Sequence, residues 1–231
     1  DSYPYNANST FALHPQFLHL PAVGKLKDKR EMERYEELGK ELNSLPNVDY
    51  ERVNRAKAEY LHLIFEQDGN KTLASKEFKA FMEANEEWLR PYAIFCALRD
   101  EKGTPDFSTW GAMAKYTKAK AAKYEKEHSE AVAYNYFVQY HLSKQLREVR
   151  DYAHANGVVL KGDIPIGISR TSVDAWVYPE LFNMDSSAGA PPDDFSVMGQ
   201  NWGFPTYNWA KMAEDGYAWW KARFVKMAEY F

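Results

Sequence analysis

Apolar residues recur at spacings of three and four along most of the first two thirds of the chain. Between about Asp28 and Ala155 the pattern is that of amphipathic helices, as in the series Val53, Ala56, Tyr60 and Ile64. Asn85 is followed by two glutamates, which predicts an N-cap that opens a new helix there. The pattern therefore predicts a helix-rich region.

The pattern changes at Asn156-Gly157. The preceding long helix is predicted to end there, because glycine adopts the left-handed conformation that follows many helices. The apolar run from Val158 to Lys161 then predicts a buried strand, and the sequence GDIPIG at 162–167 breaks it with glycine and proline. A helix, a tight turn and a buried strand predict an α/β unit with a parallel sheet.

The last sixty residues divide into a loop and a helix. Residues 169–207 are rich in Gly, Pro, Ser, Asp and aromatic residues, and their aromatic content predicts an ordered loop. A helix is predicted from about Trp209 to Phe231. It ends on apolar residues without a glycine cap or a polar tail, which indicates a truncated chain.

Composition narrows the classes of partner. The chain has 29 Lys and Arg against 33 Asp and Glu, a formal charge of -4, so neither nucleic acid nor an anionic membrane surface is expected. No apolar run approaches the length needed to cross a bilayer. A single cysteine, Cys96, fits a reducing compartment, and a cytoplasmic protein is expected. No signal peptide is visible, although one could have been removed, because the chain does not open on methionine.

The histidines and the cysteine lack the spacing of metal ligands, and no phosphate-binding or dinucleotide-binding loop is present, so neither a metal nor a cofactor is expected. Asp163 follows the predicted strand, where a parallel sheet exposes its loops to a substrate; an aspartate that caps a turn is the equal alternative. The segment 189–195 combines prolines, two carboxylates and Phe195, and Gln200 and Trp202 follow it. Aromatic faces beside carboxylates and amides suit sugars, but they also occur in plain structural loops.

Four segments together resemble the 4-α-glucanotransferases, or amylomaltases. They are SYPY with STFALHP (2–15), KGDIPIGIS (161–169), DAWVYPELF (174–182) and GAPPDDFSVMGQNWGFPTYNW (189–209). The last is the most specific. GQNWGFPTYNW within it, together with VYPELF, is most similar to the branch with the plant cytosolic disproportionating enzyme and its bacterial relatives. The resemblance implies an α-rich α/β fold: a partial (β/α)8 TIM-type barrel with a large helical insertion. The expected parts are a barrel-derived segment at 1–24, a mainly helical insertion at 25–130, and a βα barrel segment at 131–231 with its active-site loop at 185–207.

The resemblance also implies a substrate and a set of binding residues. The expected partner is an α-1,4-glucan or maltooligosaccharide, transferred to another sugar with retention of configuration. Tyr5 matches a tyrosine that stacks on the sugar, and Asp163 matches an aspartate that lines the same site. The loop residues that match glucan contacts are Asp193, Phe195, Gln200 and Trp202. Asp194 stands where many relatives have tyrosine, so the contacts of that ring are in doubt here.

A retaining transfer needs two carboxyl groups about 5 Å apart. In the family the nucleophile, the acid/base and a third aspartate all follow the position of Phe231, so no catalytic residue is assigned within the chain, which is predicted to be inactive alone. The missing C-terminal half of the barrel is then a partner, and exposed strand edges would be covered by helices, by neighbouring molecules or by a dimer. The alternatives are a hydrolase with the same barrel and a non-catalytic glucan-binding or helical interaction module.

Overall fold

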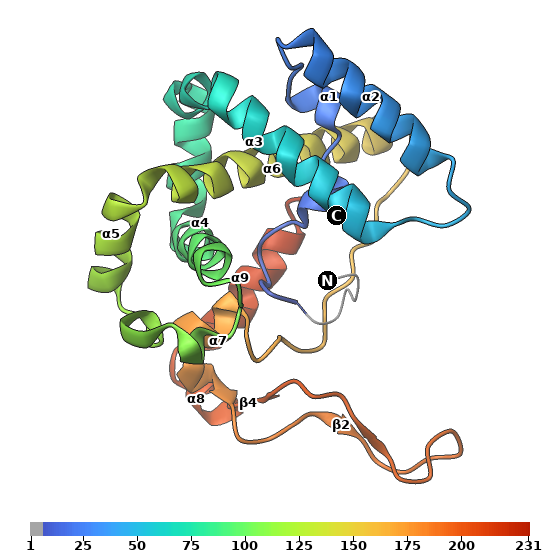
Figure 1. Cartoon of the computed structure of the whole chain (residues 1–231). Helices are drawn as coiled ribbons and strands as arrows, with labels where there is room; N and C mark the ends of the chain where they lie inside the picture. The colour runs from blue at the N-terminus through green and yellow to red at the C-terminus, as the bar shows by residue number, and fades with distance from the viewer. Residues whose placement is uncertain (1–6) are drawn as a thin grey trace. The chain divides into compact units, whose positions relative to one another are not determined.

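A computed structural model describes residues 7–231, which form two compact units (Figure 1). Of the described residues, the first unit comprises 7–11, Ile94–Glu127 and Val159–Phe231. The second comprises Ala12–Ala93 and His128–Val158. The predicted active-site loop at 185–207 and the segment that carries Asp163 both belong to the first unit.

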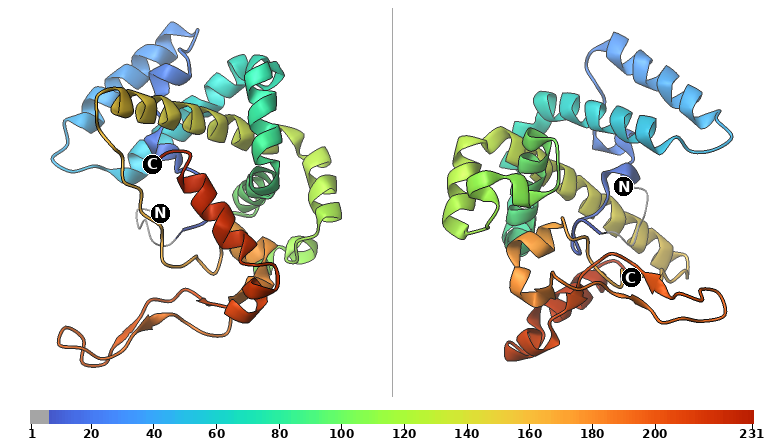
Figure 2. Two further views of the ribbon diagram at one scale, coloured as in Figure 1. Left: turned by 180° about the vertical axis from the view of Figure 1, so that it is seen from behind. Right: turned by 60° about the horizontal axis from the view of Figure 1, so that its bottom comes forward.

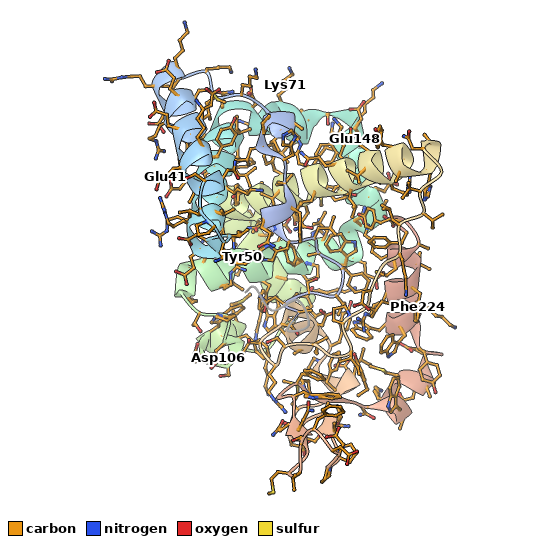
Figure 3. The ribbon with its side chains drawn as sticks, turned by 90° about the vertical axis from the view of Figure 1, so that its right-hand side faces the viewer. Glu41, Tyr50, Lys71, Asp106, Glu148 and Phe224 are labelled. Atoms are coloured by element: carbon orange, nitrogen blue, oxygen red, sulfur yellow. The ribbon has the colours of Figure 1, made fainter. Side chains whose placement is uncertain are left out.

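The second unit is helical throughout, as predicted. Asp28 and Asp49 cap the N-termini of two of its helices, because their carboxylates accept hydrogen bonds from backbone amides in the first turn. Glu41, labelled in Figure 3, lies on the first of these helices. The elements are η1 (Pro15–Phe17), α1 (Leu20–Val23), α2 (Lys29–Asn43), α3 (Tyr50–Ala74), the first part of α4 (Lys76–Lys102) and α6 (Ser129–Ala155).

The core of the second unit lies where α3 and α6 pack with η1, α1 and α2. Tyr60 is buried there, donates its hydroxyl hydrogen to the carbonyl oxygen of Gly24 at 2.7 Å, and meets Tyr35 edge-on at 5.2 Å between ring centroids. The buried residues of this core are Leu18, Leu26, Tyr35, Tyr60, Leu61, Ile64, Phe137, Val138 and Leu142.

The predicted helix start at Asn85 is wrong. Helix α4 runs without a break from Lys76 to Lys102, and Asn85 is buried within it. Its side-chain amide donates to the carbonyl oxygen of Phe81 at 2.8 Å and accepts from the indole of Trp88 at 2.9 Å. The amide is thus satisfied inside a continuous helix, and the capping hydroxyl is that of Ser75, which accepts from the amide of Phe78.

The predicted end of α6 is confirmed, but the prediction of a strand after it is wrong. Gly157 takes φ +72°, and the amide of Val158 closes the helix by donating to Ala153. Residues 158–161 form no strand, and Val159 is 81% exposed. A parallel strand requires a neighbour, and within residues 7–231 both strand pairings are antiparallel and two residues long. The predicted parallel sheet is therefore not formed by these residues.

The first unit combines short helices with a narrow β-ribbon. Its elements are the last part of α4, η2 (Phe107–Thr109), η3 (Gly111–Met113), α5 (Lys118–Glu127), α7 (Val173–Val177), η4 (Pro179–Leu181), β1 (Phe182–Asn183), β2 (Gly189–Ala190), β3 (Gln200–Asn201), β4 (Thr206–Tyr207), α8 (Trp209–Glu214) and α9 (Ala218–Met227). The terminal helix predicted from Trp209 is in fact two, because Gly216 and Tyr217 take φ 68° and 64° and interrupt it. A core of Ile168, Ala175, Leu181, Phe182, Met212 and Trp219 lies where α7, η4, β1, α8 and α9 meet.

None of the helices described in residues 7–231 combines the length and the apolar character that a bilayer span requires.

Candidate functional site

The segment that carries Asp163 is extended and packs against α9 and β4. Pro165 accepts a hydrogen bond from the guanidinium of Arg223 at 3.0 Å, and Ile166 accepts one from the hydroxyl of Tyr207 at 3.0 Å. Asp163 itself is exposed, and its carboxylate accepts from the amide of Ile164 at 2.9 Å. The segment therefore holds a carboxylate at the surface of the first unit, bonded to a neighbouring backbone amide as the capping alternative expects.

Glycine is required at position 167 of this segment. A methyl group there would collide with the ring of Phe204, because the ring lies directly against the backbone of Gly167. Phe204 is buried, and its neighbour Trp202 packs against it with ring centroids 5.9 Å apart. Contact between Gly167 and Phe204 thus brings the extended segment and the aromatic loop together.

The aromatic loop, residues 182–207, is an antiparallel ribbon that we call the arm. Strands β1 and β4 pair at its base, and β2 pairs with β3 farther out. Between these pairs, Ala188 donates to Phe204 at 2.8 Å and accepts from Trp202 at 3.0 Å. The arm extends away from α8 in Figure 1, and Figure 2 shows it from two further sides.

The tip of the arm, residues 191–199, is organised by Asp193. Its carboxylate accepts from the amides of Phe195 at 3.0 Å and Ser196 at 2.7 Å, and its own amide donates to the carbonyl oxygen of Ser196. On this turn Phe195 is 97% exposed. Val197 and Met198 beside it are 83% and 91% exposed. The tip thus presents apolar side chains on a turn held by hydrogen bonds.

Two further predicted site residues meet on the outer part of the arm. The indole of Trp202 donates to the side-chain oxygen of Gln200 at 2.9 Å, and the ring of Trp202 is 42% exposed. The structure therefore brings Gln200 and Trp202 into contact. Asp193 and Phe195 lie on the tip, and Asp163 lies on the separate extended segment. Tyr5 lies outside the described residues, so its predicted stacking role stays a prediction.

The sequence analysis did not single out Arg170, which holds the base of the arm. Its guanidinium donates to the carbonyl oxygens of Met184, Ser186 and Gly203 and to the hydroxyl of Ser187. Arg170 is the one arginine between Arg150 and Arg223. Its acceptors are mainly backbone carbonyl oxygens, so no residue pattern in the sequence pointed to it.

Asp174, in the segment DAWVYPELF, was also missed, and it is a buried carboxylate. It accepts hydrogen bonds from the amide of Thr10 at 2.9 Å, the hydroxyl of Thr10 at 2.8 Å and the indole of Trp219 at 3.1 Å. Burial raises the pKa of Asp174 above its ordinary value, and the bonds from Thr10 and Trp219 oppose that rise. The carboxylate fastens the N-terminal segment to α7 and α9.

Arg223 on α9 is buried among aromatic rings. Its guanidinium lies over the rings of Trp219 and Trp220, at 4.7 Å and 4.5 Å from their centroids, and burial lowers its pKa. Tyr207, 3.5 Å from a guanidinium nitrogen, has its pKa raised by burial. These contacts fix α9 to the extended segment and to the base of the arm.

The arm combines exposed aromatic side chains with polar groups. The arm places aromatic faces beside an amide and carboxylates, which suits the C–H faces and hydroxyls of a pyranose. Within residues 7–231, no three His, Cys, Asp or Glu side chains lie close enough together to hold a metal ion.

Comparison with known proteins gives consistent matches over the whole chain. A family model described as 4-α-glucanotransferase matches residues 1–231. The chain is 46% identical to the 4-α-glucanotransferase DPE2 of Oryza sativa subsp. japonica, over 100% of this chain and 25% of that protein. It is 36% identical to the 4-α-glucanotransferase of Chlamydia caviae, over 100% of this chain and 43% of that protein. The chain therefore spans less than half the length of these curated relatives.

A solved structure agrees with these matches. The amylomaltase from Streptococcus agalactiae, in complex with acarbose, is similar with a TM-score of 0.82 and 26% identity. The similarity covers 99% of this chain and 47% of that one.

Proposed function

The chain belongs to the 4-α-glucanotransferase family, and from that premise we propose that it supplies the glucan-binding arm of an enzyme that transfers α-1,4-glucan segments. The observation that carries the proposal is the exposure of Phe195 and Trp202 on an ordered arm. Several exposed apolar side chains grouped on one hydrogen-bonded ribbon, here Phe195, Val197, Met198 and Trp202, support a binding surface.

The polar groups of the arm support a sugar as the ligand. Gln200 lies against the indole of Trp202, and Asp193 and Asp194 directly precede Phe195 in the sequence. A pyranose offers an apolar face and a rim of hydroxyls, and this combination of rings, amide and carboxylates complements both. The Streptococcus agalactiae amylomaltase was solved with acarbose, which supplies a defined probe for the test below.

The fold proposal is that the chain forms part of a (β/α)8 barrel. In it, 1–24 and 131–231 belong to the barrel, with the active-site loop at 185–207, and 25–130 is a helical insertion. Phe224, labelled in Figure 3, projects from α9 and is 57% exposed, and Val225 beside it is 67% exposed. Such exposed apolar side chains on a helix support further chain packing there.

We place bond cleavage outside this chain. A retaining transfer uses a carboxylate nucleophile and a carboxyl acid/base. The buried carboxylate of the described residues, Asp174, has both oxygens bonded to Thr10 and Trp219, so it is committed to structure. In the proposed division, this chain binds and covers the glucan, and the part of the protein that its relatives carry beyond this match supplies the two reacting carboxyl groups. Glucan covered by the arm would favour a sugar acceptor over water.

The buried Cys96 supports the proposal of a cytoplasmic, reducing location.

Binding and turnover test the proposal separately. In the complete protein, Phe195→Ala and Trp202→Ala are each expected to weaken acarbose binding by roughly tenfold in titration calorimetry, as expected for the loss of a stacking ring worth about 1.4 kcal/mol. Tyr152→Ala is the control, because Tyr152 is 73% exposed on α6, away from the arm in the sequence. Unchanged binding in both arm variants would remove the arm from the glucan site.

Incubation with maltotriose distinguishes the proposed activity from its alternatives. The complete protein is expected to release glucose together with longer oligosaccharides, whereas the 231-residue chain alone is expected to release nothing. Glucose and maltose without longer products would indicate the hydrolase instead. No product from the complete protein, with acarbose still bound, would indicate a glucan-binding module.

A further inference from the structure

Arg170 bonds to both sides of the arm at its base. On the outgoing side its guanidinium donates to the carbonyl oxygens of Met184 and Ser186, and to the hydroxyl of Ser187 at 2.8 Å. On the returning side it donates to the carbonyl oxygen of Gly203 at 2.8 Å. One side chain thus joins two stretches of chain that lie between the β1–β4 and β2–β3 pairs.

The arm needs such a connection because its own pairings are short. Each of its ladders is two residues long, and an isolated two-stranded ribbon is marginally stable in water. Arginine presents five donors in a rigid planar fork, so it can bond to several carbonyl oxygens at once. Its hydrogen bonds are charge-assisted and therefore stronger than those between neutral groups.

The turn that carries Arg170 also holds the N-terminal segment. The amide of Ser169 donates to the carbonyl oxygen of Ala7 at 3.0 Å, and the amide of Val173 donates to that of Asn8 at 2.9 Å. The carboxylate of Asp174 then bonds to Thr10. Residues 169–174 are therefore a common attachment for the arm and for the segment that begins at Ala7.

We propose that Arg170 is a positioning residue for glucan binding: its guanidinium fixes the direction of the arm, and through it the placement of Phe195 and Trp202. This inference rests on the proposed function of the arm. Arg170 lies at the base and Phe195 at the tip, so Arg170 acts through the backbone of the ribbon. Its loss is expected to leave the arm attached at β1 and β4 but variable in direction.

Hydrogen exchange and acarbose binding in the complete protein test the proposal. In Arg170→Gln, peptides that cover residues 184–204 are expected to exchange faster, whereas peptides of α9 keep their rates. Acarbose binding is expected to weaken roughly tenfold, because the arm must be ordered on binding. Arg170→Lys keeps the charge but lacks the fork, so it is expected to behave like Arg170→Gln. Ser187→Ala removes one of the acceptors and is expected to have a smaller effect in the same direction.

Arg30→Gln is the matched control, because Arg30 is an exposed arginine at the start of α2. Full rescue by lysine would show that charge alone matters and would overturn the proposal. Faster exchange across α9 together with the arm would also overturn it, by showing a general loss of stability. If Phe195→Ala and Trp202→Ala weaken acarbose binding but Arg170→Gln does not, the positioning role fails and the proposed function stands. If none of the three weakens binding, the proposed function itself fails.

Discussion

The carboxylate of Asp174 accepts a hydrogen bond from the indole nitrogen of Trp219 at 3.1 Å, in the interior of the first unit. Asp174 lies in the first turn of α7, where the helix dipole favours a negative charge, and Trp219 lies on α9. The same carboxylate bonds to Thr10, so three segments distant in sequence meet at one buried acid. The packing of α7, α9 and the N-terminal segment therefore depends on the carboxylate of Asp174, whose charge is costly to bury.

Stability is expected to fall with rising pH because of Asp174. Burial raises its folded-state pKa above the unfolded value of 3.8, so the folded protein holds this proton more tightly. The contribution of Asp174 to the free energy of unfolding is fully present below pH 3.8. It is lost as the pH rises through the raised pKa of the folded protein. The difference in free energy of unfolding between wild type and Asp174→Asn, measured by urea at several pH values, isolates this trend from other acids. Glu87→Gln, at an exposed position on α4, is the control for the removal of a carboxylate at the surface. A difference for Asp174→Asn that does not vary with pH would contradict the expectation.

A buried amide on α6 is expected to contribute strongly to the second unit. Gln139 is 1% exposed and bonds to both the amide and the carbonyl oxygen of Leu13, at 2.9 Å and 2.8 Å. Gln139→Leu leaves these two backbone groups without partners, which is expected to lower the free energy of unfolding by about 2–4 kcal/mol. Gln145 makes the same pair of bonds to His19 nearer the surface, where water can replace them. Gln145→Leu is therefore expected to cost less than half as much in urea unfolding, and equal losses would refute the burial argument.

The sequence predicts secondary structure that depends on neighbouring residues. It fails for secondary structure that depends on residues distant in the sequence. The helices of the second unit follow from local spacing, and the end of α6 follows from Gly157, which takes the left-handed conformation. Asn85 and two glutamates read as a helix start, but the apolar face of α4 continues through them and the burial of Asn85 decides the outcome. The strand at 158–161 was wrong for the same kind of reason, because a strand requires partners that residues 7–231 do not supply.

The candidate site also combines residues that the sequence pointed to with residues that it did not. The motif at 189–209 singled out Gln200 and Trp202 as glucan contacts, and the structure places these two side chains in contact with each other. Their role in glucan binding stays a prediction. Arg170 was not predicted, because its acceptors are mainly backbone carbonyl oxygens, which leave no trace in residue type. The roles of Asp163 and Asp193 in glucan binding stay predictions.

The second unit is expected to lose stability in mild acid because of His141. This histidine is buried on α6 beside Phe137, its Nε2 has no hydrogen-bond partner within the described residues, and burial lowers its pKa to about 4. The unfolded chain takes up the proton near pH 6.5, so stability is full above that value and falls as the pH drops toward 4. The fall is expected to reach roughly 3 kcal/mol. His141→Leu should remove it, and urea unfolding of both proteins between pH 4 and 7.5 measures the difference; parallel curves would exclude His141 as the cause.

The contact between Gly167 and Phe204 is expected to behave as a coupled pair. Gly167→Ala places a methyl group against the ring of Phe204, which is expected to destabilise the protein by about 1–3 kcal/mol. Phe204→Leu removes ring atoms at that point, so the double variant should be less destabilised than the sum of the two single variants. Gly39→Ala is the control, because nothing lies within 4 Å of its added methyl group in α2, and it is expected to stabilise by about 0.5–1 kcal/mol. A double-mutant cycle in urea gives the coupling directly, and strict additivity would mean that the extended segment and the arm are not held together by this contact.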